Sequence, residues 1–193
     1  MGADRLESAQ GSEKELTDAE ACEISLLHNI RYHEDREAHF AFWNRLLDFF
    51  VLVSGLGTVI ALSDMLPTYF QFDGRIIAAA TSVIGAIQLI VGLAKKEHVH
   101  GDLRRRFLAL HAEFADSTPA EIRRKMRALV AEEPPTYHAV DALAYNFAQA
   151  ALDRPERYLK VVTTRQRLLR NWRRYVDTPF PRRCEIEGTN SVK

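Results

Sequence analysis

Hydrophobic residues recur at helical spacing along most of this 193-residue chain, and long stretches of strictly alternating polar and apolar residues are missing. Ile24, Leu27 and Ile30 begin one apolar face, and nothing ends the pattern before Asp64. Such periodicity is typical of helices, whereas strands require alternation. The sequence therefore predicts an all-α protein whose first long helix begins near Glu15.

Two long uncharged runs depart from the amphipathic pattern. The first covers the 15 residues 49–63, and the second covers the 19 residues 76–94. A helix needs roughly 20 mostly apolar residues to cross the hydrocarbon core of a bilayer. The second run meets this length, and Leu46 and Leu47 extend the first run past Asp48. We therefore expect a two-transmembrane helical hairpin over 46–95, with helices at about 46–63 and 76–94 and an outer loop over 64–75.

Charged residues give this hairpin an orientation. Basic residues gather before the first run and after the second, whereas the connection carries only Asp64 and Asp73 before Arg75. By the positive-inside rule, both termini would lie in the cytoplasm and the short loop outside. The basic residues on the cytoplasmic side are Arg31, Arg36, Arg45, Lys95, Lys96, Arg104, Arg105 and Arg106.

A soluble helical bundle is the alternative, because helices that are apolar on every side also form the centre of large cores. This chain is too small to bury two such helices, since each remaining helix offers only one apolar face. The uncovered remainder would form a large exposed hydrophobic patch. The sequence thus favours lipid around the two runs.

The rest of the chain divides into polar segments. Residues 1–14 are small and charged, and we expect them to be disordered. A cytoplasmic N-terminal helix over 15–45 would lead into the hairpin. A cytoplasmic helical region would cover 96–177, and a flexible tail would cover 178–193.

Helix boundaries can be placed in the region after the hairpin, where the second helix should project well beyond its apolar part. Thr118, Pro119 and Glu121 have the spacing of a capping box, which starts a new helix. Thr136 would cap the next helix, and Asp153 would begin the last one. The expected inward faces are Val140, Leu143 or Ala144, Phe147 and Ala151 in the former, and Tyr158, Val162, Leu169, Trp172 and Val176 in the latter.

Polar and small residues follow one stripe in each apolar run. Such residues let helix backbones approach and form hydrogen bonds, so packing within the hairpin or between copies is one hypothesis. The other hypothesis is that the stripe with Gln88 lines a water-filled pathway in an oligomer, because a polar side chain facing lipid is costly. The stripe of the first run holds Ser54 and Thr58, and that of the second holds Thr81, Gly85, Gln88 and Gly92.

Nothing in the sequence has the spacing of a catalytic or metal site. The seven histidines include no His-Glu-x-x-His pattern and are most simply surface residues, and Cys22 and Cys184 match no metal spacing. The net charge is zero, from 26 basic and 26 acidic residues, which does not indicate nucleic-acid binding. We therefore expect a protein that is not an enzyme and needs no cofactor or metal.

Arginines cluster beyond the apolar runs, and three interpretations of them stay open. The first is the solvated face of amphipathic helices, and the second is contact with the anionic inner leaflet of a membrane. The third is an anionic ligand or partner, including the acidic N-terminal segment of the chain itself. The candidates for membrane or ligand contact are Arg104, Arg105, Arg106, Arg165, Arg170, Arg173 and Arg174.

The helix that approaches the hairpin, the hairpin and the helix after it together resemble a known family. The segments read RYHEDREAHFAFWNRLLDFFVLVSGLGTVIAL and AAATSVIGAIQLIVGLAKKEHVHGDLRRRFLALHAEF, and the resemblance covers about residues 20–176. This layout is similar to that of the SLATT family, the two-transmembrane effector domains associated with SMODS nucleotidyltransferases and SLOG domains in bacterial conflict systems.

The resemblance implies a function. SLATT domains are thought to oligomerise and breach the inner membrane on a nucleotide second messenger or another infection signal, so that the infected cell dies or stops growing. The chain would then be a bacterial inner-membrane effector of anti-phage defence that forms a homo-oligomeric pore in the lipid bilayer. A separately encoded sensor or messenger synthase would be its partner. A non-conducting membrane anchor that recruits a cytoplasmic partner is the alternative.

Overall fold

The computed structural model describes residues 16–62 and 74–190. All regular structure in that part of the chain is helical, apart from one isolated β-bridge between Lys160 and Arg182. This confirms the expected all-α class. The expected disordered segment 1–14 and most of the expected outer loop 64–75 lie outside the described residues.

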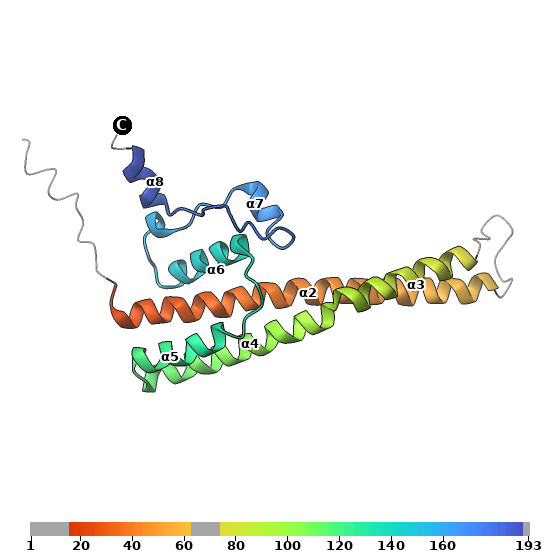
Figure 1. Ribbon diagram of the computed structural model, residues 1–193, viewed down its shortest axis with the longest axis horizontal. Helices are drawn as coiled ribbons and strands as arrows, with labels where there is room; N and C mark the ends of the chain where they lie inside the picture. Colours follow the sequence, from red (N-terminus) through yellow and green to blue (C-terminus); the bar gives the residue numbers. More distant parts are fainter. Residues whose placement is uncertain (1–15, 63–73, 191–193) are drawn as a thin grey trace, which may run out of the picture.

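A single helix, α2 (Asp18–Leu62), runs for 45 residues through both the polar and the apolar part of the N-terminal half (Figure 1). It begins with a reciprocal cap. The Glu20 amide donates a hydrogen bond to Thr17 Oγ1 at 3.2 Å, and the Thr17 amide donates one to Glu20 Oε2 at 3.0 Å. The expected uninterrupted first helix is thereby confirmed.

The second helical segment extends well beyond its apolar run, as predicted, and is interrupted at a single residue. α3 (Gly74–Val91) carries the apolar run and packs along the end of α2, and α4 (Leu93–Glu113) packs along the polar part of α2 (Figure 1). Gly92 lies between them with φ 60° and ψ 44°. Glycine adopts this left-handed conformation without the steric penalty of a β-carbon, and apolar periodicity does not reveal it. The break falls where the apolar run gives way to Lys95 and Lys96.

Helices α2, α4 and α5 enclose the main hydrophobic core. α5 (Pro119–Val130) follows a 3-10 turn, η2 (Phe114–Asp116), and folds back beside α4 (Figure 1). The predicted capping box starts it, because the Glu121 amide donates to the Thr118 side chain and the Thr118 amide donates to the Glu121 side chain. The core residues are Cys22, Leu26, Leu103, Phe107, Leu110, Ile122 and Met126.

α6 (His138–Ala151) packs on α2 as well, away from α4 and α5 (Figure 1). Its N-cap is Tyr137 and not the expected Thr136. The Tyr137 amide donates a hydrogen bond to the hydroxyl of Tyr32 at 3.1 Å, so a contact with α2 replaces a local cap. Helices α2, α4, α5 and α6 are called the helical bundle below.

The inward face of α6 agrees only in part with the expected one. Val140 and Ala144 are fully buried, as expected, whereas Phe147 and Ala151 are exposed. Small side chains take most of the buried positions, which lets the helix lie close against α2. The buried residues are Ala139, Val140, Ala142, Ala144, Ala148 and Gln149.

The expected last long helix does not form. Two short helices, η3 (Glu156–Tyr158) and α7 (Thr164–Leu168), are joined by irregular segments instead. Trp172 and Val176 were expected to face inward but are 65% and 61% exposed. Tyr175 has a φ of 53°, which a continuous helix does not allow. Apolar residues can thus follow helical spacing by chance in a segment that is not helical.

The segment expected to be a flexible tail, 178–193, contains a further helix, α8 (Arg183–Asn190). At its start the Arg182 amide donates a hydrogen bond to Glu185 Oε2 at 2.9 Å. The Pro-rich residues before it end one helical pattern, but they do not prevent a new helix after them.

Candidate functional site

The two polar stripes of the apolar runs face each other across the contact between α2 and α3. Thr81 Oγ1 donates a hydrogen bond to Ser54 Oγ at 2.7 Å, and Gln88 Nε2 donates one to Asp48 Oδ1 at 2.6 Å. Ser54 Oγ in turn donates to the carbonyl oxygen of Phe50 at 2.6 Å. Polar groups between the two apolar helices therefore find partners within the single chain.

The other stripe residues lie differently. Thr58 Oγ1 donates to the carbonyl oxygen of Ser54 at 2.9 Å, within its own helix. A β-carbon added at Gly85 would meet no atom within 4 Å, so glycine is not required there for close helix approach. Gly92 forms the break after α3. In the described part of the chain, none of these three forms a side-chain hydrogen bond between α2 and α3.

The apolar helix pair, defined as residues 49–60 of α2 together with α3, exposes its outward surface. Leu89 and Ile90 are 85% and 84% exposed, and Leu52 is 72% exposed. By length and composition, the described residues contain two helices long and apolar enough to cross a membrane, and their most apolar windows are 0% and 6% buried. The core helix of a soluble protein would have most of this surface covered.

Two buried histidines join α2 to α4 inside the helical bundle. His33 and His100 are 0% and 4% exposed, and their Nδ1 atoms lie 2.9 Å apart. His33 Nε2 lies 3.2 Å from Glu133 Oε1. If His33 donates its Nε2 proton to this carboxylate, its Nδ1 accepts a proton from His100 Nδ1–H, which satisfies the pair in its neutral form. This corrects the expectation that the histidines are surface residues.

Aromatic rings enclose these imidazoles. His33 stacks on Phe107 with ring centroids 5.5 Å apart, and His100 stacks on Phe40 at 5.6 Å. Burial lowers the pKa of His100 to about 3, and the neighbouring His33 and Arg36 act in the same direction. His100 is therefore neutral at pH 7.

Arg36 is a buried cation one turn along α2 from His33. Its side chain is 1% exposed, and its guanidinium lies between the rings of Tyr137, at 3.8 Å, and Phe40, at 4.5 Å. Nη1 donates a hydrogen bond to Asn171 Oδ1 at 2.9 Å, but Nε has no acceptor and no described carboxylate pairs with this arginine. Burial lowers the pKa of Arg36, yet an arginine stays protonated at neutral pH. A charge is thus held in the bundle without a counter-ion.

A cavity of about 620 Å³ opens beside Arg36, where α3 ends and α4 begins. Its charged lining residues, Arg36, Lys95, Lys96 and Arg174, are all basic, and no acidic residue lines it. We call it the basic cavity. His100 also lines it. The remaining lining residues are Phe40, Leu89, Ile90, Val91, Gly92, Val99, Pro134, Pro135 and Tyr137.

Of the seven arginines predicted to contact a membrane or an anion, only Arg174 lines the basic cavity. The others are spread over the bundle. Arg104 lies 3.1 Å from Glu37 and lines a different cavity with three carboxylates. Arg105 and Arg106 pair with Asp102. Arg165 and Arg170 lie in and just after α7, and Arg173 lies over the Tyr175 ring.

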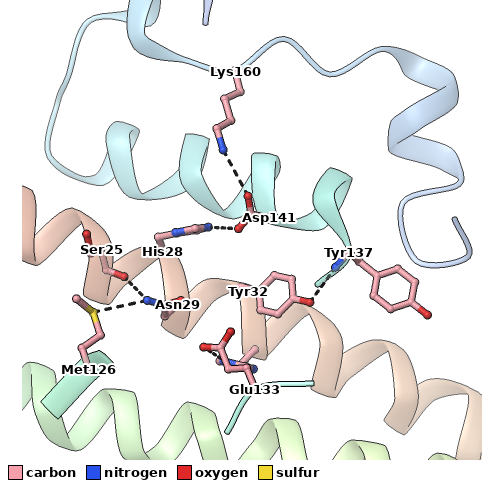
Figure 2. Close-up of polar contacts among 10 residues, drawn as sticks. Ser25, His28, Asn29, Tyr32, Met126, Glu133, Tyr137, Asp141 and Lys160 are labelled. Atoms are coloured by element: carbon pink, nitrogen blue, oxygen red, sulfur yellow. Dashed lines mark hydrogen bonds and ion pairs between the residues drawn. The ribbon is translucent and has the colours of Figure 1, made fainter. Parts of the chain in front are cut away.

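Polar contacts join α6 to α2 and to the segment that follows α6 (Figure 2). Asp141 of α6 lies between His28 of α2, at 2.8 Å, and Lys160 of the following segment, at 3.4 Å. Burial alone would raise the pKa of the Asp141 carboxyl, but the hydrogen bonds and charges of His28 and Lys160 bring it below its ordinary value. Asp141 therefore stays ionised and holds both partners.

The cluster of His33, Arg36 and His100 was not predicted from the sequence. His33 and Arg36 lie three residues apart on the buried side of α2, which continues the apolar face of Leu26 and Ile30. A polar residue at a core position of a long amphipathic helix is the signal that could have found them. The described residues contain no group of three or more potential metal ligands.

The fold and these sites define an all-α protein with an exposed apolar helix pair and a polar cluster in its bundle. Comparisons with protein-family models, with curated proteins and with solved structures found no match.

Proposed function

We propose that this chain is an integral membrane protein whose apolar helix pair crosses a bilayer as a hairpin and whose helical bundle lies in the cytoplasm. The uncovered apolar surface carries this proposal, because the most apolar windows of the two candidate spans are 0% and 6% buried. Exposing such surface to water costs roughly 25 cal/mol per Å² of apolar area, whereas lipid tails are as apolar as the side chains.

Residues at the ends of the helix pair support this orientation. Arg45 precedes the first apolar run, and Lys95 and Lys96 follow the second, as the positive-inside rule requires of cytoplasmic ends. Trp43 packs against Trp172 with ring centroids 5.3 Å apart, near the expected membrane surface, where tryptophan is enriched.

In this proposal the chain is an effector of the bacterial inner membrane that permeabilises the bilayer when an infection signal arrives, as the resemblance to SLATT domains implies. Copies associate through the exposed apolar surface, and the bundle controls the association. Thr81 and Gln88 form hydrogen bonds to Ser54 and Asp48 of the same chain. A pore lined by them therefore requires α3 to turn relative to α2. Gly92, in its left-handed conformation, gives α3 a pivot for that turn.

A non-conducting membrane anchor is the second candidate, and the same hydrogen bonds favour it. Ser54, Thr81 and Gln88 already have partners, so a stable hairpin needs no water-filled lumen to satisfy them. In this case the bundle recruits a cytoplasmic partner while the membrane stays intact.

Membrane insertion is tested first. Membranes from cells that express the full chain are extracted at alkaline pH, and a cysteine introduced as Thr68→Cys is labelled with an impermeant maleimide. The native Cys184, half-buried in the structure, is the internal control because it would lie in the cytoplasm. We expect resistance to extraction, labelling at position 68 in intact cells, and labelling of Cys184 only after lysis. Release into the soluble fraction would overturn the proposal.

Permeabilisation is tested second, with the purified chain reconstituted into dye-loaded vesicles. An effector releases the dye when its trigger is added, and Gln88→Leu changes the rate of release. A chain that is shown to be oligomeric but leaves the vesicles intact with every candidate trigger is an anchor.

A further inference from the structure

We propose that the basic cavity is a binding site for a phosphate group, held by Arg36, Lys96 and Arg174 at the junction of α3 and α4. The site itself follows from the contacts of these residues. Only the source of the phosphate rests on the proposed function, because a membrane at this level would supply it as a lipid headgroup.

The charge of the cavity has one sign. Four basic side chains line about 620 Å³ of space without an acidic residue among them. This volume is within the range of sites that hold small ligands. In contrast, the other cavity of the same volume is lined by Glu34, Glu37 and Glu97 as well as two arginines, so its charges compensate one another. An anion therefore complements the basic cavity, whereas this second cavity has no excess of either charge.

The positive charge of the cavity does not come from flexible surface lysines alone, because Arg36 is buried. A guanidinium that is 1% exposed and lacks a carboxylate partner carries a large desolvation cost. Its Nε has no acceptor, while Tyr137 and Phe40 hold the guanidinium plane by cation–π contacts. A phosphate in the cavity would supply the missing counter-charge, and arginine is well suited to bind it.

Neighbouring groups are compatible with an anion. His100 is neutral and brings no charge of its own at pH 7.

An apolar rim favours a lipid as the source of the phosphate. Leu89 and Ile90 line the cavity and are also the most exposed apolar side chains of α3. Acyl chains would lie along these residues while the phosphate lies among the cations. A free phosphate compound would use the same cations but would gain nothing from the rim.

Binding is measured with the full chain in a neutral, non-ionic detergent, as the shift in unfolding midpoint when a probe is added. The probes are dioctanoyl phosphatidylglycerol, dioctanoyl phosphatidylcholine and inorganic phosphate. The variant Lys96→Gln/Arg174→Gln removes two exposed cations from the cavity. The matched control, Arg105→Gln/Arg167→Gln, removes two exposed cations that do not line it. Far-ultraviolet circular dichroism verifies that both variants keep their helix content.

We expect a saturable rise with phosphatidylglycerol at concentrations where the other two probes have no effect. The cavity variant should bind it about tenfold more weakly or worse, since charge-assisted hydrogen bonds are lost, and the control should bind as the unchanged chain does. An equal rise with inorganic phosphate would keep the site and assign it to a soluble phosphate compound. No saturable rise with any probe, or equal binding by both variants, would overturn the proposal.

The outcome is separable from that of the membrane proposal. If alkaline extraction releases the chain while inorganic phosphate still stabilises it through Lys96 and Arg174, the phosphate site stands and the hairpin does not. If the chain resists extraction but no probe binds, the hairpin stands and the phosphate site does not.

Discussion

His33 and His100 meet through their Nδ1 atoms at 2.9 Å although 67 positions separate them in the sequence. The pair joins the unbroken helix α2 to α4, the helix that begins at the Gly92 break, and Glu133 binds the outer nitrogen of His33. Two histidines that share one proton between their Nδ1 atoms tolerate little additional charge in a buried site. The folded bundle is therefore stable with this histidine pair in its neutral form.

Acid should destabilise the bundle through His100. Its pKa is about 3 in the folded chain and 6.5 without burial, so the unfolded chain binds more protons between these values. Stability is fully present above pH 6.5 and is lost as the pH falls toward 3. From pH 7 to pH 5 this histidine alone should remove about 2 kcal/mol. His39, with a pKa lowered to about 4 by burial and by the charges of Arg36 and Arg170, acts in the same direction.

The measurement is the unfolding midpoint by circular dichroism at pH 7, 6 and 5. His100→Gln keeps a donor toward His33 but does not titrate, so its midpoint should fall less steeply with acid. His98→Gln, at an exposed position of the same helix, should retain the original slope. Equal slopes for the two variants would refute the assignment to His100.

Truncating the ring under His33 should cost far more than truncating its exposed neighbour in sequence. Phe107 is 0% exposed and packs in the main core, so Phe107→Ala should destabilise the chain by about 3–5 kcal/mol. Leu108 is 42% exposed, and Leu108→Ala should change the stability by only about 0.5 kcal/mol. Denaturant unfolding measures both, and comparable losses would contradict the position of the core.

Removing the side-chain hydrogen bonds between α2 and α3 should lower the stability of the apolar helix pair. Gln88→Leu leaves the Asp48 carboxylate without its 2.6 Å donor, and Thr81→Ala leaves Ser54 without its donor. A hydrogen bond between helices in a membrane contributes about 0.6 kcal/mol, with an upper range of about 2. A double-mutant cycle on Ser54→Ala and Thr81→Ala isolates this coupling. A coupling of zero would mean that the two side chains do not meet in the folded protein.

Gly92 and Gly85 should respond oppositely to alanine. Gly92 has a φ of 60°, so Gly92→Ala should destabilise the break by about 1–2 kcal/mol. Gly85 lies within α3 with open space around its missing side chain, so Gly85→Ala should stabilise the helix by about 0.5–1 kcal/mol. The free energies of unfolding distinguish the two, and a neutral Gly92→Ala would contradict the left-handed conformation.

Local signals were sufficient for much of this fold. The capping box at Thr118 acts within four residues, and the uninterrupted periodicity from Ile24 onward specifies α2, so both could be predicted from sequence. The Gly92 break could not, because a glycine within an apolar run is equally compatible with an intact helix. The prediction of a long last helix was wrong for a different reason. Trp172 and Val176 have helical spacing, but both side chains are exposed and pack into no core.

The candidate sites were harder to predict because they join distant segments. The Ser54 and Thr81 stripes were found, since each lies within one apolar run. The basic cavity combines Arg36, Lys96 and Arg174, and no local pattern relates a residue of α2 to one near the C-terminus. In the sequence, Arg36 cannot be distinguished from the other charged residues before the apolar run. Only its burial in the structure sets it apart.

The two long helical segments differ in continuity, since α2 is unbroken and the α3–α4 segment is interrupted, and this difference has a mechanical consequence. At the usual rise of about 1.5 Å per residue, the 45 residues of α2 form a rod about 68 Å long without an internal joint. A rotation of its polar end, where the bundle packs, would therefore reach Ser54 in the apolar end of the same helix. The neighbouring helical segment is interrupted at Gly92, so α3 does not have to rotate together with α4. Such a difference in stiffness would strain the hydrogen bond between Ser54 and Thr81, so a change in the bundle would shift α2 relative to α3 at that contact.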